Sequence, residues 1–397
     1  MKDKILGVRK NIFFLGLVSF FNDFSSEMVQ SVMPVFLTVT LGAPVFVVGL
    51  IEGVADALSS IVKLISGWIS DKIGKRKKLA VFGYSLSVTT RLFLVLATSF
   101  WQVFSLRIVD RFGKGFRDAP RDALISESVP KEELGMSFGF HRAMDTMGAT
   151  LGPLFAFLLI FYFMLSYQSL FLVAFFMGLF AIASFIFIKD QKIQKLEAQK
   201  KKIKLDWNIF KTHKKFIFIV GSLFILGLGA LPIGLVILKA KEIGSIAQVP
   251  LMYFVYSLTF VIVAVPIGKL ADRIGEKLVI AGGFTFAALS YIGLAFTGNI
   301  ATLTLLFMML GVYSACTDGM QRMLAAKSLY GEFAATGQGF LNMALGFSSL
   351  GAGIIGGLLW TVVNSQAAFF YATIMSIIGL ILFVLVSRNK YIGHFVI

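Results

Sequence analysis

Cysteine, histidine and charged residues are scarce in this 397-residue chain, and each scarcity excludes a class of protein. The single cysteine, Cys316, excludes an internal disulfide, and no grouping of histidine and cysteine has the spacing of a metal site. No Gly-x-x-x-x-Gly-Lys-Ser/Thr segment occurs, which argues against ATP hydrolysis, and no nucleophile–base set is apparent. We therefore expect no bound metal, no cofactor and no enzymatic activity.

Charged residues make up only 15% of the chain, against about a quarter in soluble domains, while hydrophobic residues make up 57%. The charge balance is strongly positive, with a formal net charge of +16. The lysines and arginines, however, gather in short loops between apolar segments, where they signal the orientation of a membrane protein. The composition thus predicts an integral membrane protein without a nucleic-acid partner.

Twelve apolar stretches are long enough to cross a bilayer, which takes roughly 20 residues in a helix. The first contains Asp23 and Glu27 and is too long to be a cleavable signal peptide. We expect an all-α integral membrane protein with twelve transmembrane helices. The predicted spans are residues 12–38, 45–69, 79–99, 102–122, 136–163, 168–188, 215–240, 248–270, 278–297, 300–325, 335–361 and 366–387.

Lysine and arginine are concentrated in one alternating set of loops and are nearly absent from the other. Cytoplasmic loops carry the excess of positive charge, so this set and both termini are predicted to face the cytoplasm from the cytoplasmic (inner) membrane. The one long connection, residues 189–214, is rich in lysine. It is predicted to be a cytoplasmic linker, either lying on anionic lipid or simply solvated.

A basic loop motif occurs twice. Residues Gly67 to Arg76 and Gly268 to Lys277 both read Gly-x-x-x-Asp-basic-Ile-Gly-x-basic. The aspartates, Asp71 and Asp272, lie 201 positions apart (272 minus 71), about half of the chain length. The chain is therefore predicted to contain two copies of one unit, residues 1–188 and 215–397, with the linker between them.

Twelve spans in a six-plus-six repeat, a basic central loop and this paired motif resemble the major facilitator superfamily, in a branch similar to drug/proton antiporters. Arg107 stands near the start of span four, where that family often has a buried arginine. Gly148-Ala149-Thr150-Leu151-Gly152-Pro153 matches the core of the signature of antiporters, although Phe157 follows Ala156 where the family usually has small residues. The resemblance implies two six-helix bundles related by a pseudo-two-fold axis and a secondary transporter that works by alternating access.

The resemblance also implies roles for the motif residues. The two loops are expected to gate the cytoplasmic side, with their aspartates accepting from a neighbouring helix end or arginine. The small residues of the antiporter-like signature are expected to pack helices closely. The predicted gating positions here are Gly67, Asp71, Lys72, Gly74, Arg76, Gly268, Asp272, Arg273 and Gly275, and the packing positions are Gly148, Gly152 and Pro153.

Span four carries a charged stripe. At 100° per residue its charged side chains fall on one face of about 140°. A charge facing lipid costs roughly 3 kcal/mol at the bilayer centre, so this face is expected to look into protein or a water-filled cavity. We interpret Arg107, Asp110, Arg111 and Lys114 as substrate-binding or coupling residues. Nearer the cytoplasm, gating or an internal salt-bridge ladder is expected for Arg117, Asp118, Arg121 and Asp122.

Span one carries two acids, Asp23 and Glu27, on one face and one turn apart. Asp23 lies ~16 Å into the span, close to the bilayer midplane. Two carboxylates at this spacing repel each other when both are charged, which favours uptake of a proton. We predict that they form the proton-coupling site, with Arg107 or Arg111 in salt-bridge reach; a permanently ionised pair is the alternative.

Other polar positions carry weaker predictions. In the second half, Asp318, Gln321 and Arg322 share a face of span ten and are predicted to contact substrate; Asp318 follows Asp118 by 200 positions. His141, Arg142 and Asp145 are interpreted as gate or packing residues. The sequence leaves three roles open for Tyr253 and Tyr256: contact with substrate, an aromatic belt or a core position.

These patterns predict a monomeric, proton-coupled secondary transporter that exports a small polar, anionic or zwitterionic solute. Arginine and lysine would bind the acid groups of that solute. One alternative is an importer of a carboxylate-type metal chelate, such as a siderophore. Another is a divalent-metal exporter using Asp23 and Glu27 as ligands, against which the neighbouring arginines argue. A receptor or scaffold derived from a transporter is the last.

Overall fold

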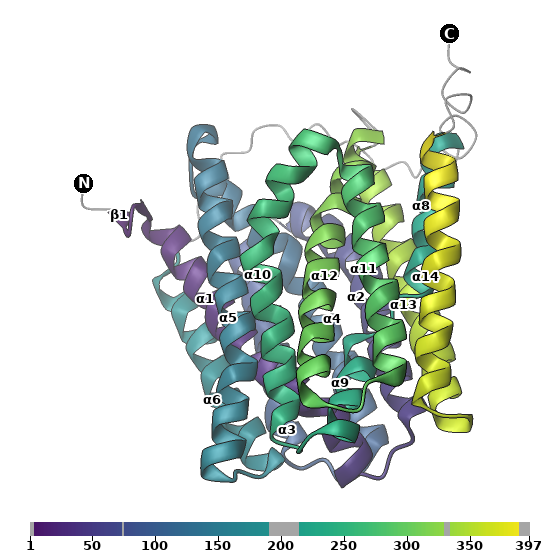
Figure 1. The fold of residues 1–397 in the computed structure, drawn as a ribbon. Coiled ribbons are helices and arrows are strands. Elements are labelled where there is room, and N and C mark those ends of the chain that lie inside the picture. The colour runs from purple at the N-terminus through teal and green to yellow at the C-terminus, as the bar shows by residue number, and fades with distance from the viewer. Residues whose placement is uncertain (1–3, 74, 190–213, 329–333, 389–397) are drawn as a thin grey trace. The chain divides into compact units, whose positions relative to one another are not determined.

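The computed structural model describes residues 4–73, 75–189, 214–328 and 334–388, and these are almost entirely helical (Figure 1). Contacts divide the chain into two compact units. The first comprises Met1–Ala43, Leu58–Glu197 and Ser245–Phe254, and the second comprises Pro44–Ala57, Ala198–Gly244 and Val255–Ile397. The predicted all-α fold is confirmed.

The first half of the chain begins with a short hairpin of β1 (Lys4–Ile5) and β2 (Val8–Arg9), whose turn places Gly7 at a φ of 82°. Six long helices follow, and they coincide with the first six predicted spans. They are α1 (Lys10–Val35, extended by a π-helical turn over Phe36–Thr40), α2 (Val45–Ile73), α3 (Arg76–Leu94), α4 (Phe100–Glu127), α5 (Leu134–Phe163) and α6 (Tyr167–Ser184).

The second half matches the remaining six predicted spans, with one interruption. Span seven is divided into α8 (Lys214–Leu228) and α9 (Ile233–Ile243). Gly229 and Pro232 lie in the interruption, and proline has no backbone N–H to continue a helix. The other helices are α10 (Gln248–Ile274), α11 (Glu276–Phe296), α12 (Ile300–Ser328), α13 (Ala334–Val362) and α14 (Ser365–Arg388).

Ten helical segments among the described residues are long and apolar enough to cross a membrane. The two predicted spans outside this set are α3 and α4, and both carry several charged residues. They are therefore helices that need protein neighbours on their polar side if they are to lie in a bilayer.

The two halves share a pattern of helix neighbours. In the first half α1 packs on α5 and α6, and α3 packs on α4 and α6. In the second half α8 packs on α13 and α14, and α11 packs on α12 and α14. Gly83 of α3 lies against the backbone of Gly113 in α4, and Gly283 of α11, 200 positions later, lies against Cys316 in α12. The internal repeat inferred from the loop motif thus extends to helix packing.

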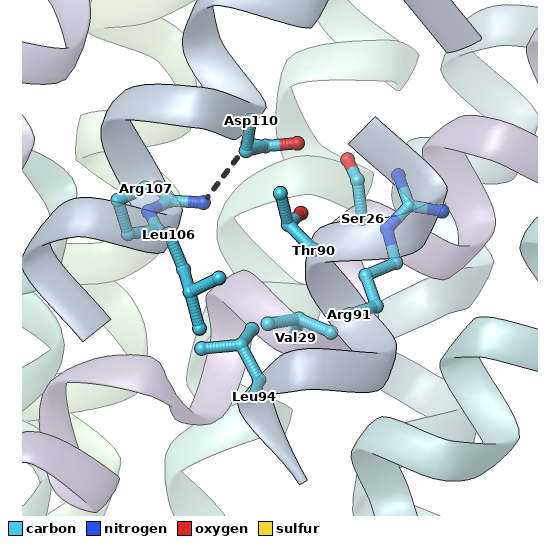
Figure 2. Close-up of a pocket in the computed structure, with 8 residues that line it drawn as sticks. All are labelled: Ser26, Val29, Thr90, Arg91, Leu94, Leu106, Arg107 and Asp110. Carbon is cyan, nitrogen blue, oxygen red and sulfur yellow. Dashed lines mark hydrogen bonds and ion pairs between the residues drawn. The ribbon is translucent and has the colours of Figure 1, made fainter. Parts of the chain in front are cut away.

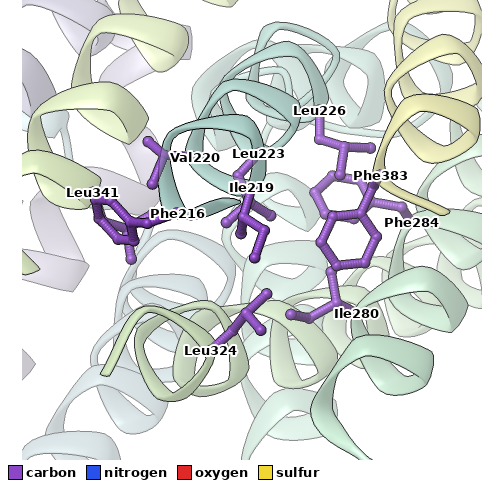
Figure 3. Close-up of a cluster of buried hydrophobic side chains, with 10 residues drawn as sticks. All are labelled: Phe216, Ile219, Val220, Leu223, Leu226, Ile280, Phe284, Leu324, Leu341 and Phe383. Carbon is purple, nitrogen blue, oxygen red and sulfur yellow. The ribbon is translucent and has the colours of Figure 1, made fainter. Parts of the chain in front are cut away.

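The apolar cores of the two units differ in what surrounds them. In the second unit a cluster built on Phe216, Leu223 and Phe284 joins α8, α11, α12, α13 and α14 (Figure 3). In the first unit a cluster that includes Ile12, Tyr84 and Leu124 holds one end of α1, α3 and α4 together. Beyond that end, the first unit buries polar side chains, among them Asn22, Arg91 and Arg117, as well as apolar ones.

The units defined by contacts depart from a division at the linker in two places. The start of α2, residues 45–57, belongs with the second unit, where Gly49 packs on the backbone of Gly353 and Gly53 on Leu350. The start of α10, residues 248–254, belongs with the first unit, where Tyr253 meets Glu27. The start of α2 thus packs within the second unit through glycines, and the start of α10 within the first unit through a hydrogen-bonding tyrosine.

Candidate functional site

The polar face of α4 is turned inward. The side chains of Arg107 and Arg117 are 6% and 4% exposed, whereas Val109 and Phe112 on the opposite face are 37% and 39% exposed. Two glycines of the helix permit this, because Gly113 lies against the backbone of α3 and Gly115 against Val62 of α2. The stripe therefore faces protein, as the helical periodicity predicts.

Arg117 is the arginine that pairs with Asp23. Its Nη2 lies 3.7 Å from Oδ1 of Asp23, and its Nη1 donates to Oδ1 of Asn22 at 2.9 Å. Asn22 in turn donates from Nδ2 to Oδ1 of Asp23 at 2.7 Å. The guanidinium also lies over the ring of Tyr84, 4.5 Å from its centroid. A residue that the sequence assigns to the gate thus lies at the centre of the polar cluster.

Arg107 has a different set of partners. Its Nη2 donates to Oε1 of Gln30 at 2.5 Å, and its Nη1 lies 3.5 Å from Oδ2 of Asp110. Arg111 also interacts electrostatically with Asp110. Contact between Arg107 or Arg111 and the acids of α1 stays a prediction.

A small cavity opens beside the Arg107–Asp110 pair, between α1, α3 and α4. Figure 2 shows this pair on one side of the cavity and Ser26 and Arg91 on the other. Arg91 is 2% exposed and donates to Oγ of Ser25 at 2.6 Å and to Oδ1 of Asn22 at 3.0 Å. The residues that line the cavity are Ser26, Val29, Thr90, Arg91, Leu94, Leu106, Arg107 and Asp110.

Glu27 lies apart from this arginine cluster in its hydrogen bonding. Oη of Tyr253, at the start of α10, donates to Oε2 of Glu27 at 2.7 Å. The two acids of α1 therefore have different environments: Asp23 faces an arginine and Glu27 faces a phenol. Tyr253 is 9% exposed, which makes it a buried partner.

Asp145 of α5 is a member of the cluster that sequence reasoning left in the gate or packing class. Ser19 Oγ donates to its Oδ1 at 2.7 Å, and Arg142 Nη1 lies 3.2 Å from its Oδ2. Its carboxyl group also interacts electrostatically with that of Asp23. The antiporter-like signature of α5 could have indicated this role of Asp145. Gly148 packs on the carbonyl of Phe20 and Gly152 on that of Phe24, so Asp145, one turn earlier, faces Ser19.

Asp118, Arg121 and Asp122, near the end of α4, form an ion-pair network with Lys63 of α2. Lys114 interacts electrostatically with Asp23 and Asp118. Asp118 accepts from Lys63 Nζ at 3.0 Å and lies 3.7 Å from Arg121, which itself contacts Asp122 at 2.9 Å. This network is compatible with both roles that the sequence leaves open for these residues, a gate and an internal salt-bridge ladder.

The loop motif is only partly described. Gly74 lies outside the described residues, and so do the surroundings of Gly67 and the side chains of Asp71 and Lys72. Arg76, which follows them, pairs with Glu127 at 2.9 Å. In the second copy, Gly275 adopts a φ of 91°, which favours glycine, at the start of α11, and Asp272 and Arg273 are exposed. Space is open around Gly268. The linker residues 190–213 are also outside the described part.

The second half contributes fewer charges. Asp318 pairs with Arg322 at 3.0 Å, and these side chains are 40% and 58% exposed. Gln321 is buried, and Tyr256 hydrogen-bonds to Ser314 at 2.6 Å. Within the described residues no group of histidine, cysteine and acidic side chains is placed to hold a metal ion.

The comparison with known proteins settles the family. A sequence model of the Major Facilitator Superfamily matches residues 15–244 and 217–394. The chain belongs to the Major Facilitator Superfamily. It is a transporter of this family and not an enzyme, and a transporter implies a small-molecule substrate.

Two relatives are named as MFS-type transporters without a substrate. An uncharacterized MFS-type transporter of Methanocaldococcus jannaschii is 33% identical over 381 residues, which is 94% of each chain. An uncharacterized MFS-type transporter of Bacillus subtilis is 25% identical over 346 residues, 82% of this chain and 84% of its own.

Solved structures show the same superfamily fold. The peptide transporter POT in complex with sulfate superimposes with a TM-score of 0.80 at 15% identity, covering 98% of this chain and 96% of its own. The nucleoside transporter NupG superimposes with a TM-score of 0.74 at 15% identity, covering 96% and 100%. At this level of identity the likeness concerns the fold alone.

Proposed function

We propose that this transporter is proton-coupled and moves a small polar solute, anionic or zwitterionic, by alternating access. The observation that carries the proposal is the pairing of Asp23 with the buried Arg117, while a second acid, Asp145, accepts a hydrogen bond from Ser19 on the same helix as Asp23. An ionisable cluster inside the membrane is costly, and such clusters mark ion or proton pathways in transporters. The carboxyl groups supply sites for a proton and the guanidinium groups supply sites for an anion.

The charge around the cavity supports an acidic substrate group. Arg91, Arg107 and Arg111 surround the single carboxylate of Asp110. This leaves an excess of positive charge on α3 and α4 that a carboxylate or phosphate of the solute would complete, with bidentate geometry at a guanidinium. A divalent-metal exporter is disfavoured by the same excess. In the second half, Asp318, Gln321 and Arg322 are proposed to contact the solute.

The relation between proton and solute follows from the pairing at Asp23. If a solute anion binds an arginine that supports the carboxylate, the carboxylate loses that support and takes up a proton more readily, so both bind together, as in symport. If the solute is cationic at this site, it competes with the proton, as in antiport. Glu27 and Asp23 are the residues proposed to couple the two, and the arginine involved at Asp23 is Arg117.

Direction and surroundings are part of the proposal. We place the protein in the cytoplasmic membrane with both termini in the cytoplasm, on the distribution of lysine and arginine, and we propose that it acts as a monomer. Export is favoured by the antiporter-like signature at Gly148 to Pro153. An importer of a carboxylate-type metal chelate uses the same arginines and is the second candidate.

A transport assay with a pH gradient tests the proposal. Purified protein is reconstituted in liposomes, a pH gradient is imposed, and uptake of radiolabelled amino acids, dicarboxylates, phosphate esters and iron-loaded citrate is measured. We expect at least one acidic solute to accumulate against its concentration gradient, and Asp23→Asn to abolish that accumulation while exchange of solute persists. Counterflow that ignores the pH gradient would show a uniporter instead.

A further inference from the structure

One amide group on α1 holds two buried arginines of the first unit. Oδ1 of Asn22 accepts a hydrogen bond from Nη2 of Arg91 on α3 at 3.0 Å and from Nη1 of Arg117 on α4 at 2.9 Å. Asn22 is fully buried, and the two arginines are nearly so. Two positively charged guanidinium groups from different helices therefore converge on one neutral oxygen.

The neighbours of Asn22 fix the orientation of its amide. A guanidinium group only donates hydrogen bonds, so the amide oxygen must face the two arginines. The amide nitrogen then donates to Oδ1 of Asp23 at 2.7 Å. An amide can accept from two cations and donate to an acid at once. An ionised aspartate in its place would accept from the arginines but could not donate to Asp23.

Within the described part of the chain, neither arginine has a short hydrogen bond to a carboxylate. Arg91 donates to Oγ of Ser25 at 2.6 Å and to Asn22, and both acceptors are neutral. Arg117 lies 3.7 Å from Asp23 and 3.8 Å from Asp118, beyond the range of about 2.7–2.9 Å of a charge-assisted hydrogen bond. A buried charge is costly unless an opposite charge completes it, so this pair lacks a closely bound negative group.

The fold keeps space for both arginine side chains. A methyl group on Gly178 of α6 would lie 2.7 Å from Nη1 of Arg91, and one on Gly83 of α3 would lie 2.8 Å from Cβ of Arg117. The guanidinium group of Arg117 also lies over the ring of Tyr84, 4.5 Å from its centroid. Both cations are thus held in position before any solute arrives, which lowers the cost of binding one.

The cavity beside the Arg107–Asp110 pair gives access to this arrangement. Arg91 and Ser26 lie on one side of the cavity, and Ser26 follows Asn22 by one helical turn (Figure 2). A negatively charged group in the cavity would therefore meet the side chain of Arg91 first. Apolar side chains complete the lining, which suits a short carbon chain attached to such a group: Val29, Leu94 and Leu106.

We propose that Arg91 and Arg117 form the oxyanion-binding site of the transporter, and that the amide oxygen of Asn22 occupies this site when no solute is bound. A carboxylate or phosphate group of the solute enters from the cavity, accepts hydrogen bonds from both arginines and displaces the amide. Guanidinium groups match the geometry of both kinds of oxyanion. The proposal rests on the proposed function and deepens it, because it assigns the acid group to this pair and makes Arg117, the partner of Asp23, the link between solute and proton.

The thermal stability of the purified full-length protein in detergent tests the site without transport. The melting temperature is measured in increasing acetate, succinate, inorganic phosphate and glycerol phosphate, and in sodium chloride of the same ionic strength. A ligand that binds only the folded protein raises this temperature. We expect a saturable rise with the carboxylates or with the phosphates, beyond the effect of chloride, and the class that responds identifies the acid group. If none of the four raises the temperature beyond chloride, the site is overturned.

Asn22→Asp places a carboxylate permanently on the two arginines. The apparent dissociation constant of the responding oxyanion should rise roughly tenfold or more, the factor that corresponds to one hydrogen bond to a charged group. Arg91→Lys keeps the charge but loses the planar fork, so it should also weaken binding, and it tests the site even if Asn22→Asp fails to fold. Asn11→Asp is the matched control, because it adds the same charge about three turns earlier on α1, beside Ser128 and Lys189. It should leave the dissociation constant unchanged.

The site and the proposed function can fail separately. Binding that survives both Asn22→Asp and Arg91→Lys overturns the site. An acidic solute that Asn22→Asp accumulates under a pH gradient as the wild type does also overturns the site, and leaves proton-coupled transport standing. If both variants lose binding but the wild type accumulates no solute under a pH gradient, proton-coupled transport is refuted and the oxyanion site stands.

Discussion

The carboxylate of Glu52 on α2 accepts a hydrogen bond from the backbone N–H of Gly234, 3.0 Å away, in the first turn of α9. The first N–H groups of a helix have no partner within it, and here the helix begins inside an interrupted span. A carboxylate at a helix N-terminus satisfies such a group and also suits the helix dipole. Glu52 is 8% exposed, so it ties the start of α2 to α9 in the second unit.

Removal of this cap should destabilise the protein. We expect Glu52→Ala to lower the free energy of unfolding by about 1.5–3 kcal/mol, the usual loss for a hydrogen bond to a charged group, and Glu52→Gln to cost less because its carbonyl still accepts. Thermal unfolding in detergent, followed by tryptophan fluorescence, measures the difference. Asp56→Ala, one turn away and exposed, is the control and should cost less. Equal effects at the two positions would argue against a cap.

The Tyr253–Glu27 hydrogen bond should appear as an energetic coupling between α10 and α1. Tyr253→Phe removes only the hydroxyl group, and Glu27→Gln removes the charge that it serves. A double-mutant cycle of unfolding free energies should give a coupling of at least about 1 kcal/mol, since the side chains are in direct contact. Tyr256→Phe in a parallel cycle with Glu27→Gln should give none, because its hydroxyl bonds to Ser314. Additive effects for Tyr253 would contradict the contact.

Arg117 should be far more sensitive to truncation than an exposed arginine. Arg117→Ala leaves the largely buried carboxylate of Asp23 without its cation and removes the packing on Tyr84, so a loss of about 3–5 kcal/mol in unfolding free energy is expected. Arg117→Lys keeps the charge but loses the planar contact with the ring and with Asn22, and should be intermediate. Arg322→Ala, which breaks an exposed pair with Asp318, should cost less than about 1 kcal/mol. Chemical unfolding in urea ranks the three variants.

Glu133 should make the anchoring of the amino-terminal hairpin depend on pH. Hydrogen bonds from Arg9 and Lys4, at 3.0 and 3.1 Å, lower the pKa of Glu133 in the folded protein. When the pKa of a carboxyl group is lower in the folded protein than in the unfolded chain, its ionised form stabilises the fold. This stabilisation is present above the pKa of the unfolded chain, about 4.3 for glutamate, and is lost as the pH falls through the pKa of the folded protein. Limited proteolysis at Lys4 and Arg9 should therefore speed up in acid.

Two variants check the assignment to Glu133. Glu133→Gln should give fast cleavage at every pH, because it lacks the charge that holds the hairpin. Glu132→Gln, which alters the neighbouring exposed side chain, should retain the pH dependence of the wild type. If cleavage of the wild type proves independent of pH between neutral and pH 4, the hairpin is held by other contacts.

The long apolar stretches predicted the helices because the constraint is local: a run of about 20 apolar residues has few alternatives in a bilayer. The interruption of span seven was harder to place. Gly229 and Pro232 were visible in the sequence, but glycine and proline occur in continuous membrane helices when neighbours satisfy the backbone. Here the neighbour is Glu52, which lies far away in sequence, and no local pattern names it.

The composition of the polar cluster was predictable, but its pairings were not. The periodicity of α4 predicts that Arg107 and Arg117 share a face, and the structure buries both. Which of them meets Asp23 depends on how far α4 is displaced along α1, and that is set by the packing of Gly113 and Gly115 on other helices. Asp145 joins the cluster for a similar reason, since Gly148 fixes the register of α5 against α1.

The charge on α4 also constrains how the protein is made. A helix with this many charges is a poor substrate for the insertion machinery by itself, because each costs roughly 3 kcal/mol at the membrane centre. Partners of its buried charges are nevertheless already synthesised when α4 leaves the ribosome: Gln30 and Asp23 on α1, and Lys63 on α2. Because of this order of the helices, α4 can enter the bilayer against polar surfaces of α1 and α2 that are already in place. A circular permutation that places α4 before α1 should therefore fail at membrane insertion and folding, and not at the transport step.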